Sequence, residues 1–187
     1  EHYSNFDIPS LYYLLEQAGL KHIADQVVAI AGMKLNEESE FVNAFAEAYT
    51  RLVIYPSRSL LRHTDGERLV RERIRSSHIN MAATRQMIRL KHEGRIVLVF
   101  PSGTRYREGQ PDTKRGVKEV DSYLKLFDYA VLVGIAGNVL RINPNGDMSE
   151  DLATRDLVLL NVSQPFNCRA FRETARANTP KDIDPKQ

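Results

Sequence analysis

Two short stretches of the sequence combine residue types that can move a proton and hold an anion. In the first, His2 precedes Asp7 by five positions, just ahead of a helix start expected near Ile8. If the chain folds back there, the carboxylate orients the imidazole and stabilises its protonated form, which leaves the other ring nitrogen as a general base. The simpler alternative is that Asp7 serves only as the N-cap of that helix.

The second stretch, Phe100 to Arg107, follows the clearest strand-like run of the chain. Gly103 would let the backbone approach a ligand closely. Arg105 and Arg107, on one side of an extended segment, would then bind a phosphate through charge-assisted hydrogen bonds of roughly 1.5 to 3 kcal/mol each. The alternative is a turn formed by proline and glycine with two solvated arginines.

Other chemistries fit the sequence less well. Ser102 is not in the Gly-x-Ser-x-Gly arrangement of a nucleophile elbow, because the first glycine is missing. The five histidines are scattered and Cys168 is the only thiol, which argues against a zinc site. The basic stretch from Arg62 to Arg75 would suit an anionic membrane surface, a nucleic acid or an acidic carrier protein, although a solvated helix face needs no partner. A module that binds anions or a membrane surface is therefore the non-enzyme alternative.

The elements that must position these residues alternate between helix and strand. This pattern predicts an α/β fold with a mostly parallel or mixed central sheet flanked by helices. Apolar periodicity predicts helices over 8–18, 37–50, 66–92 (with a break near Ser76 and Ser77 as an alternative), 116–128 and 166–177, and strands over 26–31, 52–55, 95–100, 129–135 and 156–162. The run 95–100 is apolar throughout, as in an interior parallel strand, and ligands of such sheets lie beyond the carboxyl ends of the strands.

Length and composition indicate one folded domain. The chain has 187 residues and 21.3 kDa, with 42% hydrophobic and 27% charged residues, which excludes wholesale disorder. We expect this domain over 1–178, followed by a polar tail over 179–187. No apolar run exceeds five residues, whereas a membrane span needs about 20. With one cysteine, a cytoplasmic location, peripheral to the inner face of a membrane at most, is the simplest expectation.

The charge balance points to anionic ligands rather than to nucleic acid. Arginine supplies 18 of the 26 basic residues, and its planar guanidinium suits bidentate recognition of phosphate or carboxylate. A net charge of +2 and a pI near 8.7 lie below the range typical of nucleic-acid-binding domains.

Taken together, the two stretches resemble the glycerophospholipid acyltransferase family. Its first block is His-x4-Asp, matched by His2 and Asp7, and its third block is Phe-Pro-x-Gly-Thr-Arg about a hundred residues further on, matched by Phe100 to Arg105. The pattern Pro-Ser-Gly-x-Arg-x-Arg is similar to the soluble, plastid-type glycerol-3-phosphate acyltransferases. In that branch the loop residues and a basic pair after an earlier strand are taken to bind the substrate phosphate, which in this chain implies Ser102, Gly103, Thr104, Arg105, Arg107 and Arg58.

The sequence departs from the family pattern at four places. Ser102 stands where most members have glutamate, and Ser59 stands where the basic pair would have histidine, so that Arg62 or His63 are the candidate substitutes. The second block is reduced to the stretch 32–35, and the fourth block, near 132–134, lacks its proline. These departures leave the acceptor open between glycerol-3-phosphate and lysophosphatidate.

The resemblance implies direct acyl transfer. His2 would take the proton of an acceptor hydroxyl as it adds to an acyl thioester, and Asp7 would stabilise the imidazolium; no acyl-enzyme, cofactor or metal is implied. Acyl-ACP or acyl-CoA would be the co-substrate, with acyl carrier protein and peripheral membrane contact as expected partners and no nucleic acid.

Two further expectations follow. Family members usually carry more sequence upstream, so we expect the natural protein to extend beyond Glu1 at its amino end and the 187-residue chain alone to be weakly active or inactive. The mechanism also requires that the imidazole of His2 and the guanidinium groups of Arg105 and Arg107 face one pocket.

Overall fold

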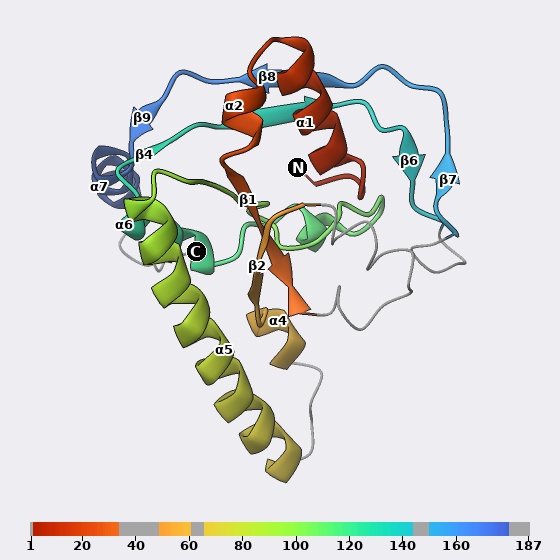
Figure 1. Cartoon of the computed structure of the whole chain (residues 1–187). Helices are drawn as coiled ribbons and strands as arrows, with labels where there is room; N and C mark the ends of the chain where they lie inside the picture. Colours follow the sequence, from red (N-terminus) through yellow and green to blue (C-terminus); the bar gives the residue numbers. More distant parts are fainter. Residues whose placement is uncertain (1, 34–48, 61–65, 144–149, 180–187) are drawn as a thin grey trace. The chain divides into compact units, whose positions relative to one another are not determined.

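The computed structural model describes residues 2–33, 49–60, 66–143 and 150–179. The chain divides into two compact units. We call Glu1–Leu20 with Phe100–Gln187 the two-motif unit, and Lys21–Val99 the sheet unit. The single domain expected over 1–178 stays a prediction. Both units are drawn in Figure 1.

The sheet unit contains a parallel sheet whose strands occur in the order β2–β1–β3. β1 (Val27–Gly32) is central and pairs in parallel with β2 (Arg51–Ile54) and with β3 (Ile96–Leu98). Val27, Val28 and Ala29 are all buried, as expected for a strand that is covered on both faces. A short helix, α2 (Lys21–Ala24), precedes β1, and another, α4 (Ser57–Leu60), follows β2.

The strand expected over 95–100 as an interior strand is shorter than predicted and lies elsewhere in the sheet. Among the described residues, β3 pairs only with β1, so it is an edge strand, and Ile96 is exposed. The prediction of an interior position was wrong because the segments 26–31 and 95–100 are both short apolar runs. Their composition does not show which of them has a neighbour on each side.

α5 (Gly66–His92) is one continuous helix, so the alternative of a break near Ser76 and Ser77 is wrong. The Ser76 hydroxyl donates to the carbonyl of Arg73 at 2.9 Å. The serine side chain is thus hydrogen-bonded within the helix and does not interrupt it. Buried Ala83, Met87 and Leu90 mark the face that packs on β2 and β3. The helix expected over 37–50 lies almost entirely outside the described residues.

The two-motif unit begins with α1 (Asp7–Gln17) and continues, after the loop from Phe100, through a 3-10 turn η2 (Pro111–Thr113) and α6 (Glu119–Leu126). Two later segments then run antiparallel beside each other, as Figure 1 shows. Their pairs are β4 (Tyr129–Ala130) with β9 (Phe166–Asn167), β5 (Val133–Ala136) with β8 (Leu159–Val162), and β6 (Leu140–Arg141) with β7 (Leu152–Ala153).

The strand predicted over 129–135 is interrupted, and the strand predicted over 156–162 is shorter, because it begins at Leu159. Val131 and Leu132 separate β4 from β5, and both are exposed, so no buried face holds these residues in a regular strand. The described helices, the parallel sheet and the antiparallel pairs are compatible with the predicted α/β class.

α7 (Cys168–Asn178) follows β9 directly and packs on α6. The Asn167 side chain caps α7 by accepting the N–H of Ala170 at 2.9 Å. Arg172 joins the two helices through Asp121, with its Nε 2.7 Å and its Nη2 3.2 Å from the carboxylate oxygens. The hydrogen bonds from Arg172 hold the pKa of Asp121 below its usual value. None of the described helices is both long enough and apolar enough to traverse a lipid bilayer.

Candidate active site

His2 and Asp7 form a direct pair in the turn that leads into α1. The imidazole Nδ1 lies 2.7 Å from Asp7 Oδ2. The Asp7 side chain is 6% exposed and that of His2 is 18% exposed, so the carboxylate is buried while the imidazole keeps some access to solvent. The spacing of the two residues therefore produces the fold-back that the sequence suggested.

The Asp7 carboxylate is held by its own local backbone. Oδ2 accepts the N–H of Tyr3 at 2.7 Å and the N–H of Ser4 at 3.2 Å, and Oδ1 accepts the Ser4 hydroxyl at 3.4 Å. The N-cap of α1 is Phe6, not Asp7, and no side chain caps that helix end. The alternative that Asp7 serves only as a helix cap is therefore wrong: its carboxylate turns back toward residues 2–4.

These contacts define the proton positions on the imidazole. An ionised carboxylate only accepts hydrogen bonds, so the Nδ1 that faces it carries the hydrogen, and Nε2 of the neutral ring has the lone pair. Within the described part of the chain, Nε2 of His2 forms no hydrogen bond. The geometry is that of an oriented base with one free nitrogen.

The loop that begins at Phe100 lies directly against His2. The imidazole stacks on the Phe100 ring, with ring centroids 4.0 Å apart and an interplanar angle of 24°. The N–H of Tyr106 donates to the carbonyl of His2 at 2.6 Å. Both the side chain and the main chain of His2 therefore contact the second motif.

Aromatic contacts extend this junction. The rings of Tyr3 and Tyr106 meet edge to face with centroids 6.1 Å apart. On Tyr106, the Lys114 ammonium lies 4.4 Å from the ring centroid, within the range of a cation–π contact. Tyr106, which lies between the two arginines, thus packs against the segment that carries His2 and Asp7, the pair that we call the dyad.

The turn of the loop is built from Ser102, Gly103 and Thr104. Gly103 has φ +62°, a left-handed conformation that favours glycine, and its N–H donates to the carbonyl of Phe100 at 2.9 Å. Ser102 is buried, and its hydroxyl donates to the carbonyl of Thr104 at 2.7 Å. Because that proton is used inside the turn, Ser102 supports the loop and has none of the surroundings of a nucleophile.

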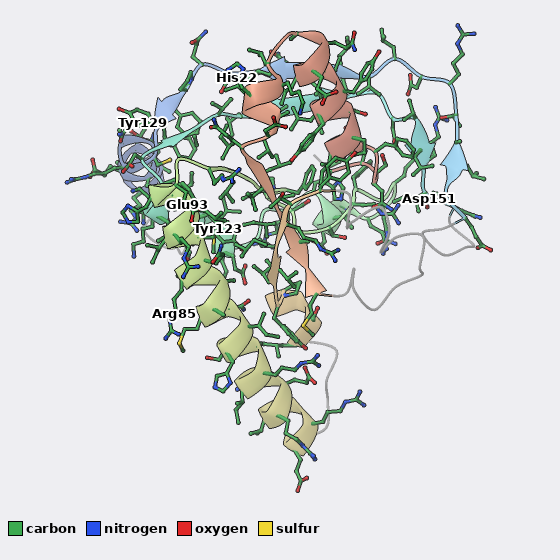
Figure 2. All side chains as sticks on the ribbon, in the orientation of Figure 1. His22, Arg85, Glu93, Tyr123, Tyr129 and Asp151 are labelled. Atoms are coloured by element: carbon green, nitrogen blue, oxygen red, sulfur yellow. The ribbon has the colours of Figure 1, made fainter. Side chains whose placement is uncertain are left out.

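Arg105 and Arg107 have different environments. Arg105 is buried, and its Nη1 forms an ion pair with Oδ2 of Asp151, which is labelled in Figure 2 beside β7. Arg107 is exposed. Its backbone N–H donates to the Thr113 hydroxyl at 3.0 Å, and its guanidinium has no partner among the described residues.

Arg58, the remaining candidate for phosphate binding, belongs to α4 in the sheet unit, and its side chain lies outside the described residues, as do Arg62 and His63. The candidate site consequently consists of residues of the two-motif unit alone. The requirement for a pocket shared by His2 and both guanidinium groups stays a prediction.

Asp151 is the residue that sequence reasoning missed. It belongs to no motif, and it lies 46 positions from Arg105 along the chain. The one usable signal is general: a buried arginine needs a carboxylate. With 24 acidic residues in the chain, that rule does not identify which one.

Comparison of the chain with family models, with curated proteins and with solved structures found no match.

Proposed function

We propose that the protein is an acyltransferase of the His-x4-Asp type, which moves a fatty acyl group from acyl-ACP or acyl-CoA to the hydroxyl of glycerol-3-phosphate. One observation carries this proposal: Nδ1 of His2 is 2.7 Å from the buried Asp7 carboxylate, and the same imidazole stacks on Phe100 of the Phe-Pro-Ser-Gly-Thr-Arg loop. A base and an arginine-bearing loop in contact suit a substrate with both a reactive hydroxyl and a phosphate.

In the proposed reaction, Nε2 of His2 removes the proton from the acceptor hydroxyl as its oxygen attacks the thioester carbonyl carbon. The tetrahedral intermediate collapses, the carbon–sulfur bond breaks, and the imidazolium returns the proton to the leaving thiolate. Asp7 stabilises the imidazolium between these steps. Arg105 and Arg107 are the candidates to bind the acceptor phosphate, so that binding energy far from the hydroxyl orients it.

The fold is part of the same proposal. A fold like that of the glycerol-3-phosphate acyltransferases agrees with the α/β class and with the motif contacts around His2. Binding of an acidic acyl carrier protein and peripheral contact with a membrane belong to this proposal as expected partners.

The test is an acceptor panel assayed by release of free thiol from acyl-CoA and acyl-ACP, on this chain and on any longer natural form of it. The acceptors are glycerol-3-phosphate, lysophosphatidate, glycerol and water. We expect release that depends on glycerol-3-phosphate and that falls about 10²- to 10⁴-fold in His2→Ala. His22→Ala is the matched control, because His22 is an exposed histidine of α2 in the sheet unit, labelled in Figure 2.

Each other outcome indicates a different function for the protein. Release with lysophosphatidate alone changes the acceptor, and release with water alone indicates a hydrolase. Phosphate binding without any turnover indicates the anion-binding module, and equal loss in both histidine variants would remove His2 from the chemistry.

A further inference from the structure

The buried pair of Arg105 and Asp151 changes what the arginine loop can do. Arg105 is 7% exposed, and the Asp151 side chain that holds it is 2% exposed. The second oxygen of Asp151, Oδ1, accepts the N–H of Asn143 at 3.3 Å. The carboxylate is therefore fixed by the backbone as well as by the guanidinium.

An anion that approached Arg105 would meet two obstacles. The charge of the guanidinium is already balanced by Asp151, and the ligand phosphate would lie close to a second negative charge in a poorly solvated place, where like charges repel strongly. Displacing Asp151 is also unfavourable, because it would leave a buried carboxylate without its cation. Exposed Arg107 presents neither obstacle.

We propose that Asp151 is a positioning residue that withholds Arg105 from the substrate phosphate and leaves Arg107 as the arginine of this loop that binds it. The inference rests on the anion-binding loop of the proposed function and refines it: the two arginines do not act as a clamp. Arg105 anchors the loop, and Arg107 binds and releases the phosphate.

The anchoring role has a direct route to the dyad. Tyr106 is covalently attached to Arg105, and its N–H donates to the carbonyl of His2. Fixing Arg105 to Asp151 thus restrains the residue that holds the main chain of His2. The same pair that lowers the affinity of the loop for phosphate keeps the base in place.

The experiment measures binding of inorganic phosphate and of glycerol-3-phosphate by calorimetry, which needs no turnover. Arg107→Ala should weaken binding about tenfold or more. Asp151→Asn frees the guanidinium of Arg105, so phosphate binding should become about threefold tighter or more. A purely structural role for Asp151 predicts weaker binding instead. Glu173→Gln is the control for net charge, because Glu173 is an exposed acid of α7.

A second variant keeps the test decisive if Asp151→Asn does not fold. Replacing both partners, Arg105→Met with Asp151→Leu, removes the buried charges together, which is tolerated far better than removing one. We expect this double variant to bind phosphate within about threefold of the parent, because Arg105 contributes little. Three results would overturn the proposal. They are loss of phosphate binding in the double variant, unchanged or weaker binding in a folded Asp151→Asn variant, and absence of binding in both the parent protein and Asp151→Asn.

These outcomes are separate from those of acyl transfer. If no acceptor is acylated but Asp151→Asn tightens phosphate binding, the proposed function is wrong and the role of Asp151 stands. If glycerol-3-phosphate is acylated and both arginines are needed for its binding, the proposed function stands and the role of Asp151 is wrong.

Discussion

The dyad and the arginine loop contact each other, yet their polar groups are satisfied in opposite ways. Among the described residues, the hydrogen-bond partners of the Asp7 carboxylate lie within five positions of it along the chain. Arg105 instead pairs with an aspartate 46 positions away. The comparison indicates that the proposed base is organised by local sequence, whereas the proposed anion site depends on a part of the fold that the motif does not contain.

The largest effect should come from the local half. In Asp7→Asn the side chain has no negative charge, so it no longer stabilises the imidazolium that would form when Nε2 of His2 takes a proton. We expect kcat for acyl transfer to fall about 10²- to 10⁴-fold with little change in phosphate binding. Thiol release and calorimetry on the same sample measure the two quantities.

The matched variant for this change is Asp25→Asn, since Asp25 is an exposed acid whose side chain pairs with Lys21 in the sheet unit. It should leave both quantities unchanged. If Asp7→Asn weakened phosphate binding as much as it lowered kcat, the two halves of the site would not be independent, and the comparison would fail.

A smaller effect should come from the contact between the halves. Phe100→Leu keeps an apolar side chain but removes the ring on which the imidazole stacks, a contact worth about 0.5 to 1.5 kcal/mol. We expect kcat to fall about two- to tenfold, with KM for glycerol-3-phosphate unchanged. Phe171→Leu, on exposed Phe171 of α7, is the control, and a change confined to KM would show that Phe100 supports the anion site instead of the base.

The smallest effect concerns the second long-range pair, Asp121 with Arg172, which joins α6 to α7 and gives a reference for Asp151. The pKa of Asp121 is lowered in the folded protein by hydrogen bonds from Arg172. Stability from this pair is therefore present above the pKa of the unfolded state and is lost as the pH falls through the folded value.

Asp121→Asn should consequently lower the free energy of unfolding by about 1 kcal/mol at pH 7. The difference from the parent should shrink as the pH is lowered from about 5 toward 3. Urea unfolding of both proteins at several pH values measures it. If the difference in the free energy of unfolding stayed constant over this pH range, the charge of Asp121 would not contribute to stability, and the pair would stabilise the protein by packing alone.

The sequence predicted the elements whose signals are local. α1, β1 and α5 were placed within a residue or two, because apolar periodicity and a glycine such as Gly94 mark them directly. The contact between His2 and Asp7 could be predicted for the same reason. These features depend on neighbours along the chain.

The features that escaped prediction depend on distant partners. The edge position of β3 depends on which strand lies beside it, and the interruption between β4 and β5 falls at exposed Val131 and Leu132, where no buried face supports a regular strand. The burial of Arg105 depends on Asp151. No local pattern specifies such partners, so motif spacing identified both arginines without distinguishing them.

Separation along the sequence also orders the assembly of the site in time. Local contacts close small loops at little entropic cost and can form early, whereas a contact between residues 46 positions apart must wait until the chain between them is organised. In a folding chain, the turn that carries His2 and Asp7 can thus exist before Arg105 has its carboxylate. The arrangement proposed for proton transfer would then form before the arrangement proposed for anion binding, and the Arg105–Asp151 contact would be the later of the two steps.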